Sequence, residues 1–245
     1  MGKFRRLNRR PNWAWSIAIA ILLVPLRTMT KRDWRHADRI PAEGGAIIAI
    51  NHVSHVDPLT AAHLTYEWGR QSFYLAKASL FRGRLGSFLR AAGQIPVDRA
   101  SGGADALSEA VAAVEAGELV VVYIEGSITK DPAGWPMVPK TGAARLALAT
   151  GAPVIPIGQW GAQQILPAYS RKPKLFPRAT IHMNVGEPMS LVGIPNDAAG
   201  IHRATDLIMD QIVALVEDVR GEKAPAERFD PIAHGMRATG NPNKD

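Results

Sequence analysis

The stretch GGAIIAINHVSHVDP, residues 44–58, decides the fold of this 245-residue chain. Its first half, Gly44–Ile50, is a short apolar run of the kind that forms a strand buried on both faces of a parallel sheet. Its second half holds two histidines, a serine and an aspartate, and it ends on Pro58. Proline suits the first turn of a helix, so we expect a strand, a polar turn and then a helix with Asp57 as its N-cap, running to about Trp68.

Apolar runs and helix-like segments alternate along the rest of the chain. Further strands are expected at four runs: SFYLAK (72–77), LVVVYI (119–124), PVIPIGQ (153–159) and RATIHMNVGEPM (178–189). Helices are expected in four segments: 79–93 (broken by two glycines), 102–118, 141–151 and 198–220. This alternation predicts an α/β fold with a central, mostly parallel or mixed sheet flanked by helices. We assign residues 36–222 to this domain and residues 223–245, rich in Gly, Pro and charge, to a surface tail.

The first 35 residues differ in character from the rest. Basic segments flank the apolar block WAWSIAIAILLVPLRTM, residues 13–29, and no cleavage site follows it. Its uninterrupted apolar core is shorter than the roughly 20 residues needed to cross a bilayer. We therefore predict an uncleaved helix in one leaflet, on the cytoplasmic face of the cell membrane, with Trp13, Trp15 and Trp34 at headgroup depth. The alternative is a soluble helix packed on the core.

Composition and charge narrow the range of partners. The formal net charge is +7, which favours an anionic partner such as nucleic acid, a membrane surface or a phosphorylated substrate. Near the N-terminus the basic residues flank an apolar block instead of alternating with polar residues, which favours an anionic membrane surface over nucleic acid. The chain has no cysteine, so disulfides, thiolate catalysis and cysteine-ligated metals are excluded.

The polar turn contains a candidate base. In a continuous helix, His52 and Asp57 would lie about 140° apart and could not pair. They can meet only if residues 52–56 form a turn and the helix begins at Pro58, which proline favours. A carboxylate against one imidazole nitrogen fixes the tautomer and leaves the other nitrogen free as a base. The histidine and carboxylate of a hydrolase triad are arranged in the same way, and here a substrate hydroxyl would take the place of the serine.

Simpler interpretations of the same residues stay open. Asp57 can be a plain helix cap, and His52 an ordinary loop histidine. A metal site would use His52, His55 and Asp57, but the spacing lacks the His-x-x-x-His pattern of a helical site and no fourth ligand is evident. Ser54 as a nucleophile lacks the Gly-x-Ser-x-Gly elbow.

Two further polar clusters lie next to predicted strands and helices. GQIPVDR ends on Arg99, downstream of a dense basic stretch that includes Lys77 and holds no acid between residues 71 and 97. Such a stretch suits phosphate recognition, and its alternative is a solvated basic face. Glu125 follows an apolar run and therefore needs a partner, while Gly126 permits close approach of the backbone.

These clusters together resemble the conserved blocks of a known family. NHVSHVD resembles the Asn-His-x4-Asp motif of the glycerolipid acyltransferases, and GQIPVDR, YIEGSIT and VIPIG resemble their second, third and fourth blocks. The four blocks span about residues 45–160 in the family's order. The whole chain, including its N-terminal segment, is similar to the 1-acylglycerol-3-phosphate acyltransferases of that family.

The resemblance implies an enzyme that moves an acyl group from acyl-CoA or acyl carrier protein to the free hydroxyl of a lysophospholipid. The acceptor would be 1-acyl-glycerol-3-phosphate and the product phosphatidic acid, with no cofactor and no metal. His52 would be the general base, Asp57 its orienting partner and Arg99 the ligand of the acceptor phosphate. The third block would supply the acceptor-binding turn through Glu125, Gly126 and Ser127.

One departure from the family pattern concerns the acceptor. Ile128 stands where the third block usually has arginine, and Tyr123–Ile124 where it usually has an aromatic residue and proline. We expect Lys130, with Lys77, to supply the missing positive charge; the alternative is an acceptor with another headgroup. Two other functions remain open: a thioesterase or lipase-like hydrolase that uses the same base on water, and a non-catalytic binding protein for lipid or acyl carrier.

Overall fold

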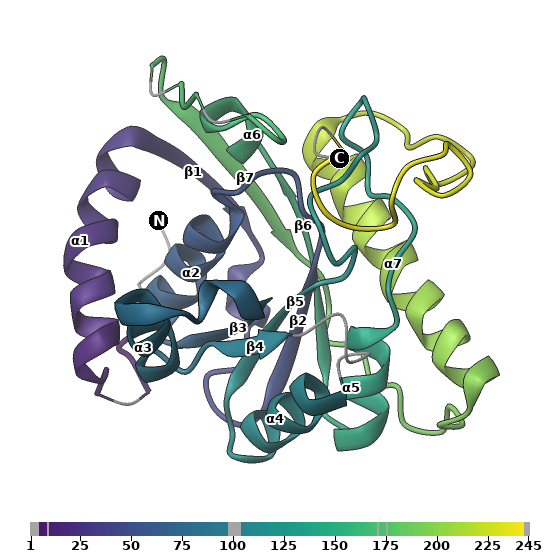
Figure 1. The fold of residues 1–245 in the computed structure, drawn as a ribbon, viewed down its shortest axis with the longest axis horizontal. Coiled ribbons are helices and arrows are strands. Elements are labelled where there is room, and N and C mark those ends of the chain that lie inside the picture. The colour runs from purple at the N-terminus through teal and green to yellow at the C-terminus, as the bar shows by residue number, and fades with distance from the viewer. Residues whose placement is uncertain (1–4, 9, 98–103, 171, 175, 243–245) are drawn as a thin grey trace.

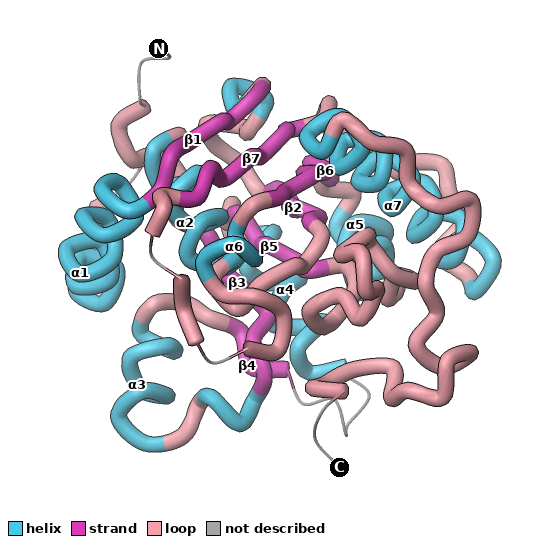
Figure 2. Tube along the Cα trace, turned by 90° about the horizontal axis from the view of Figure 1, so that it is seen from above, coloured by secondary structure: helices cyan, strands magenta, loops and turns pink. Residues whose placement is uncertain are grey.

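A computed structural model describes residues 5–8, 10–97, 104–170, 172–174 and 176–242. Its sheet has seven strands in the order β1-β7-β6-β2-β5-β3-β4, which Figure 2 shows from above. The strand bounds are β1 Thr30–Arg35, β2 Ala46–Ile50, β3 Ser72–Lys77, β4 Ile95–Val97, β5 Leu119–Tyr123, β6 Val154–Trp160 and β7 Ala179–Val185.

Strand β2, from the sequence stretch that decides the fold, lies at the centre of the sheet. It pairs in parallel with β5 on one side and with β6 on the other. All five of its residues are buried, because helices cover both faces of the sheet, and this explains its unbroken apolar sequence. The other neighbouring strands are also parallel, except that β6 and β7 are antiparallel. The prediction of a mostly parallel, mixed sheet is confirmed.

Helices form a layer on each side of the sheet (Figure 1). Ile47 and Ala49 of β2 pack on one side with buried residues of α4, α5 and α7, and Ile48 and Ile50 pack on the other side with α2. Helix α1 lies beyond α2, away from the sheet, and α3 packs against α1 toward the β4 edge of the sheet (Figure 2). The helix bounds are α1 Trp13–Met29, α2 Asp57–Glu67, α3 Gly83–Ala91, α4 Ala104–Glu115, α5 Gly142–Thr150, α6 Ala162–Ile165 and α7 Ala198–Arg220, with short 3-10 turns η1 Ala37–Arg39 and η2 Ala78–Leu80.

Both edges of the sheet differ from the expectation. Residues 30–35, which we grouped with the N-terminal anchor, form edge strand β1, where Arg32 lies opposite Ile181 of β7. Residues 95–97, for which no strand was predicted, form edge strand β4 beside β3. Edge strands tolerate charge and proline, and these two contain TKRDWR and Pro96, so neither has the apolar run by which central strands are recognised.

A buried carboxylate joins helix α1 to the rest of the domain. Glu67, at the end of α2, has a side chain only 1% exposed. It accepts hydrogen bonds from Arg27 Nε of α1 at 2.9 Å, from Arg32 Nη1 of β1 at 2.6 Å, and from His63 Nε2 of α2 at 3.0 Å. One side chain of α2 therefore ties this helix to α1 and to β1, the strand that directly follows α1 in the sequence.

Helix α1 is apolar on more than one side. Trp15 is buried and its Nε1 donates to the carbonyl of Ala92 at 3.1 Å, and Trp34 lies in β1 with its ring edge-on to His63. The prediction that Trp15 lies at headgroup depth is therefore wrong, because protein surrounds its side chain; Trp34 is partly buried, and Trp13 is 61% exposed. Among the described residues, no helix combines the length and apolar character needed to span a bilayer.

Candidate active site

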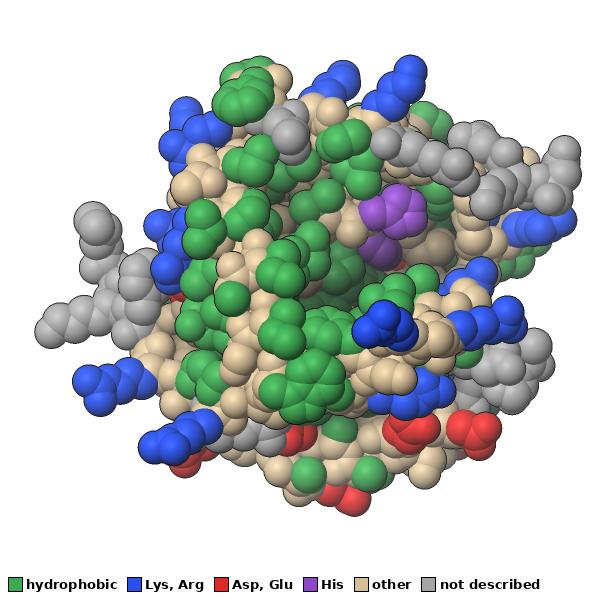
Figure 3. All heavy atoms as spheres, turned by 60° about the vertical axis from the view of Figure 1, so that its left-hand side comes forward, with side chains coloured by type: hydrophobic (Ala, Val, Ile, Leu, Met, Phe, Trp, Pro, Cys, Tyr) green, Lys and Arg blue, Asp and Glu red, His purple; other side chains and the backbone are tan. Residues whose placement is uncertain are grey.

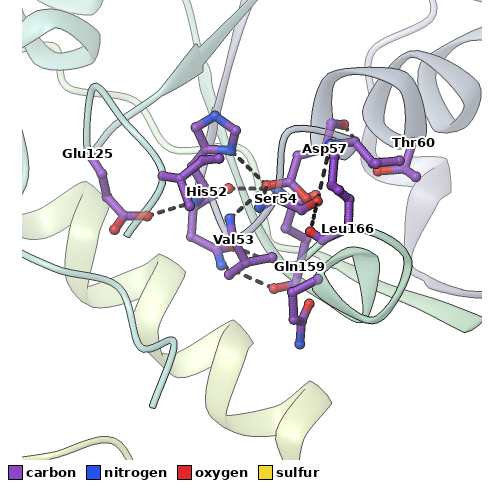
Figure 4. A network of polar contacts seen from close by, with 12 residues as sticks. His52, Val53, Ser54, Asp57, Thr60, Glu125, Gln159 and Leu166 are labelled. Atoms are coloured by element: carbon purple, nitrogen blue, oxygen red, sulfur yellow. Dashed lines mark hydrogen bonds and ion pairs between the residues drawn. The ribbon is translucent and has the colours of Figure 1, made fainter. Parts of the chain in front are cut away.

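The polar turn after β2 brings His52 and Asp57 together, as the sequence predicts. His52 Nδ1 lies 2.7 Å from Asp57 Oδ2, and Figure 4 shows the ring and the carboxylate facing each other. The Asp57 side chain is fully buried, and that of His52 is 13% exposed. A hydrogen bond of this length between residues five apart requires the break in helical structure that Pro58 favours at the start of α2.

Asp57 does not cap α2 in the predicted way. Helix α2 begins at Asp57 itself, and its capping residue is Val56, which makes no side-chain cap. The Asp57 carboxylate instead turns back over the preceding turn, where Oδ2 accepts the N–H groups of Val53 at 2.6 Å and Ser54 at 2.8 Å. The N-cap prediction is wrong because Asp57 is the first residue of α2 and not the residue before it, and its carboxylate binds the preceding turn instead of the N–H groups of the helix. The carboxylate thus fixes both the backbone of the turn and the histidine ring.

These contacts define the free nitrogen of His52. A carboxylate only accepts hydrogen bonds, so Nδ1 carries the proton and Nε2 presents a lone pair. The His52 ring is stacked on Tyr123, with centroids 4.2 Å apart, and burial raises the pKa of the Tyr123 hydroxyl well above its usual range. The ring therefore rests on a neutral aromatic surface and is aligned by Asp57, which is the arrangement that a general base requires.

Glu125 holds the backbone of His52 in place. Its Oε1 accepts the N–H of His52 at 2.7 Å, and its Oε2 accepts the N–H of Met137 at 3.0 Å. The carbonyl of His52 in turn accepts the N–H of Thr129 at 2.8 Å. The partner that the sequence analysis required for Glu125 is thus the backbone of the histidine turn. Because Glu125 is fully buried, we assign it a positioning role rather than a direct contact with substrate.

The remaining polar residues of the turn have structural contacts or are exposed. Ser54 Oγ donates to the carbonyl of Leu166 at 2.7 Å and accepts the N–H of Val56 at 3.1 Å, so it shapes the turn. His55 is exposed at the tip of the turn. In the part of the chain that the structure describes, no three His, Asp or Glu side chains are grouped so that they could hold a metal ion.

Gln159 is a partner of the turn that sequence reasoning missed. Its N–H donates to Asn51 Oδ1 at 2.8 Å, and its Nε2 donates to the carbonyl of Asn51 at 2.6 Å. Asn51 Nδ2 donates to the carbonyl of Gln159 at 3.1 Å, which completes the exchange. These bonds pin the start of the turn to strand β6. A glutamine within a buried strand was the available signal, since such an amide needs partners.

A large apolar cavity of about 760 Å³ opens beside His52 (Figure 3). This volume is within the range of about 300–1,000 Å³ that is usual for ligand pockets. Its walls come mainly from α1, α2, α3, β3 and β5, and they include Trp15, Ala18, Ile19, Leu22, Leu23, Leu26, Leu59, Ala62, Tyr74, Leu75, Phe88 and Leu89. The cavity is therefore suited to an aliphatic chain whose reactive end lies at the histidine.

The predicted substrate-binding residues are distributed unevenly around this cavity. Gly126, Ser127 and Lys77 line it. Lys130 is buried, and its Nζ donates to the carbonyl of Arg237 in the C-terminal tail instead of forming part of the cavity wall. Arg99 lies outside the described residues. Sequence reasoning missed Lys140, which also lines the cavity, because only the fold brings it next to the Glu125 turn.

The basic stretch before Arg99 has, in part, a structural role. Arg70 is almost fully buried, and its guanidinium donates to the carbonyls of Pro41, Gly44 and Gly117 at 2.8–3.0 Å. Arg90 donates to the carbonyl of Phe81 and lies over its ring. The interpretation of the stretch as a phosphate-binding surface is therefore wrong for the buried Arg70, whereas Arg90 is exposed.

Comparison with known proteins agrees with this geometry. Residues 31–160 match the family described as acyltransferase. The chain belongs to this acyltransferase family. A curated relative, the 1-acyl-sn-glycerol-3-phosphate acyltransferase of Bacillus subtilis (strain 168), is 30% identical over 156 residues, which are 62% of this chain and 70% of the relative.

A solved structure shares the fold of this acyltransferase. It is PlsC, the 1-acyl-sn-glycerophosphate (LPA) acyltransferase from Thermotoga maritima, with a TM-score of 0.64. The match covers 86% of this chain and 83% of the other, at 18% sequence identity. The α/β sheet with its covering helices is thus the architecture of a known acyltransferase.

Glu125 makes the stability of the acyltransferase depend on pH in a predictable direction. Burial raises its pKa to about 8 from an ordinary value of 4.5, against the opposing effect of the N–H groups of Met137 and His52. Between pH 4.5 and about pH 8, Glu125 is protonated in the folded protein and ionised in the unfolded chain. The folded state therefore binds more protons, and the free energy of unfolding falls as the pH rises through this range. Glu125→Gln, which is isosteric with the protonated acid, removes this titration.

We expect the free energy of unfolding of the wild type to fall, relative to Glu125→Gln, by about 1 kcal/mol per pH unit in this window. Denaturant unfolding at intervals from about pH 5 to about pH 8 measures the difference. Glu115→Gln, at an exposed position in α4, is the matched control and should follow the wild type throughout. Parallel curves for wild type and Glu125→Gln would show that Glu125 is ionised throughout.

Proposed function

We propose that this acyltransferase transfers a fatty acyl group from acyl-CoA or acyl carrier protein to the free hydroxyl of a lysophospholipid. The acceptor we propose is 1-acyl-glycerol-3-phosphate, which would give phosphatidic acid. The observation that carries the proposal is the His52–Asp57 pair at the edge of an apolar cavity of about 760 Å³. The acceptor named for the Bacillus subtilis relative supports the choice of lysolipid.

The mechanism follows from the free lone pair of His52. Nε2 of His52 removes the proton of the acceptor hydroxyl while the oxygen of that hydroxyl attacks the carbonyl carbon of the thioester. A carbon–oxygen bond forms, the carbon–sulfur bond breaks, and the proton passes from His52 to the departing thiolate. Asp57 stabilises the imidazolium between these steps, as the carboxylate of a hydrolase triad does. The reaction so written needs no covalent acyl-enzyme, no metal and no cofactor.

An acceptor screen tests this function. Purified protein is given acyl-CoA or acyl carrier protein as donor, with and without 1-acyl-glycerol-3-phosphate, and the products are identified by mass. Thiol release that requires the lysolipid, together with a diacyl product, is expected. Release without acceptor and free fatty acid as product would instead indicate a thioesterase, and the absence of turnover with any lysolipid would indicate a binding protein.

We also propose that α1 binds the cytoplasmic face of the cell membrane. Four of its residues, Trp13, Ile17, Ile21 and Val24, are 43–64% exposed, and their spacing places them along one side of the helix. The opposite side of α1 lines the cavity. A helix that is apolar all round needs apolar surroundings on every side, and the protein supplies them on one side only. Figure 3 shows apolar side chains gathered on this side of the molecule, with Lys and Arg around them.

Charge on this exposed side of α1 should release the protein from membranes. The double variant Ile21→Asp/Val24→Asp is expected to bind anionic phospholipid vesicles at least tenfold more weakly, since burying each aliphatic side chain contributes about 1.5–3 kcal/mol. Co-sedimentation with vesicles measures the effect. Val192→Asp, at a site that is 78% exposed but distant in sequence, is the matched control and should bind like the wild type. Equal binding by all three proteins would contradict the proposal.

A further inference from the structure

The C-terminal tail folds back onto the domain instead of leaving it (Figure 1). At its start, Arg228 pairs with two carboxylates of α7, those of Asp206 and Asp210. Further along, the carbonyl of Arg237 accepts a hydrogen bond from Nζ of the buried Lys130. The tail is therefore held to the domain at two places, on α7 and on the segment that follows β5.

Between these two places the tail turns on itself. The ring of Phe229 stacks on the ring of His234, with centroids 4.3 Å apart, and residues 232–237 are exposed at this turn. Beyond the turn the chain returns to the domain, and Thr239 and Asn241 are half-buried. The end of the tail is therefore packed against the protein, whereas its middle is in solvent.

The packed end of the tail forms part of the cavity wall. Gly240 and Asn241 line the same cavity as His52. A Cβ atom built on Gly126 would lie 3.9 Å from Thr239 Cγ2, so the tail runs beside the turn that carries Glu125. A segment that the sequence predicts as a surface tail thus bounds the space in which the acceptor would bind.

The tail lies on the side of the cavity where polar side chains are found. Ser127, Lys140 and Asn241 line the cavity there, and Lys140 Cγ would lie 3.2 Å from a Cβ atom on Gly126. Helix α1, which contributes only tryptophan, alanine, isoleucine and leucine to the wall, lies on the opposite side of the molecule from the tail (Figures 1 and 2). An amphiphilic acceptor would therefore place its acyl chain toward α1 and its headgroup toward the tail, because burying polar groups against an apolar wall is unfavourable.

We propose that the end of the tail, residues 239–241, limits the size of the acceptor headgroup. This inference rests on the proposed acyl transfer. A phosphate monoester ends at its phosphate, whereas a phosphate that carries a further alcohol is longer and would meet Gly240 and Asn241. One methylene more in an enzyme pocket changes kcat/KM by about 10- to 200-fold, so such a wall is enough to select among lysolipids that share the same phosphate.

A pair of acceptors tests the inference. They are 1-acyl-glycerol-3-phosphate and the same lysolipid with glycerol esterified to its phosphate, which adds bulk but no positive charge. The wild type is expected to prefer the first by at least about tenfold in kcat/KM. Thr239→Gly/Asn241→Gly removes two side chains from the end of the tail and should raise kcat/KM for the larger acceptor until the preference is about threefold or less. Asn241→Trp narrows the cavity instead and should lower kcat/KM for both acceptors by about tenfold or more.

The matched control is Ala233→Gly/Met236→Gly, which places two glycines in the exposed part of the tail, where neither residue lines this cavity. It should keep the wild-type preference, and the KM for acyl-CoA should stay within about twofold in every variant. Thermal unfolding establishes that each variant is folded.

The outcomes separate this inference from the proposed function. If the wild type makes no diacyl product from 1-acyl-glycerol-3-phosphate, the proposed function fails. If the wild type makes it but uses both acceptors equally well, or if Thr239→Gly/Asn241→Gly keeps the wild-type preference, the tail does not limit the headgroup. A change in the KM for acyl-CoA as large as the change in acceptor preference would place the tail at the donor and would also overturn the inference.

Discussion

Replacing His52 by alanine is expected to lower kcat for acyl transfer by about a thousandfold or more. A positioned general base contributes about 10²–10⁴-fold, and alanine leaves no group to accept the hydroxyl proton. The contacts that fix His52 through its backbone, with Glu125 and Thr129, do not involve the ring and should persist. Single-turnover transfer from acyl-CoA to 1-acyl-glycerol-3-phosphate measures the loss directly.

The control for this experiment is His202→Ala, which removes an exposed histidine from α7 and should retain wild-type kcat. Thermal unfolding of both variants establishes that each is folded. A His52→Ala protein that is folded and keeps more than about a tenth of the rate would exclude His52 as the base, because that loss is below the smallest contribution usual for a general base.

Glu67→Ala is expected to reduce the free energy of unfolding by about 1–3 kcal/mol, the usual cost of leaving a buried hydrogen-bond donor without its acceptor, because the buried His63 Nε2 loses its partner. Glu67 is 1% exposed, and its removal leaves Arg27 and Arg32 without their common partner. Denaturant unfolding measures the loss. Because these contacts tie α1 to α2, the variant should also have a higher KM for acyl-CoA, since α1 forms a wall of the cavity.

The matched control is Glu187→Ala. Glu187 also pairs with an arginine, Arg39 at 2.6 Å, but its side chain is 75% exposed. Exposed ion pairs contribute at most about 1 kcal/mol, so this variant should unfold close to the wild type. Equal losses in the two variants would mean that burial of the Glu67 cluster adds nothing to its effect.

The sequence predicted the centre of the fold and not its edges. Central strands such as β2 and β6 are buried on both faces, so their apolar runs identify them, and α7 begins and ends as expected because a capping aspartate and a glycine bound it. Strand β1, TKRDWR, carries the composition of a solvated segment and was grouped with the anchor. Only its pairing with β7 makes it a strand, and pairing between distant segments leaves no periodic signal in either of them.

The candidate site shows the same division. The pairing of His52 with Asp57 could be predicted because Pro58 requires a break in the helix. The two backbone N–H groups that hold the Asp57 carboxylate against His52 could not be predicted, because their position depends on the exact path of the chain through the turn. Lys140 and the tail could not be predicted, because more than ten residues of irregular chain separate Lys140 from the Glu125 turn and the tail follows only after α7.

The position of α1 determines how a lipid would reach His52. The helix is a single layer, about 10 Å across, with the cavity on its inner side and exposed apolar residues on its outer side. If lipid covers the outer side, an acyl chain passes between bilayer and cavity without crossing water, where each exposed methylene would cost about 0.8 kcal/mol. The rate would then depend on the fraction of lysolipid in the membrane surface. Adding inert phospholipid to the vesicles would lower this fraction and slow the enzyme, even though the total concentration of lysolipid stays constant.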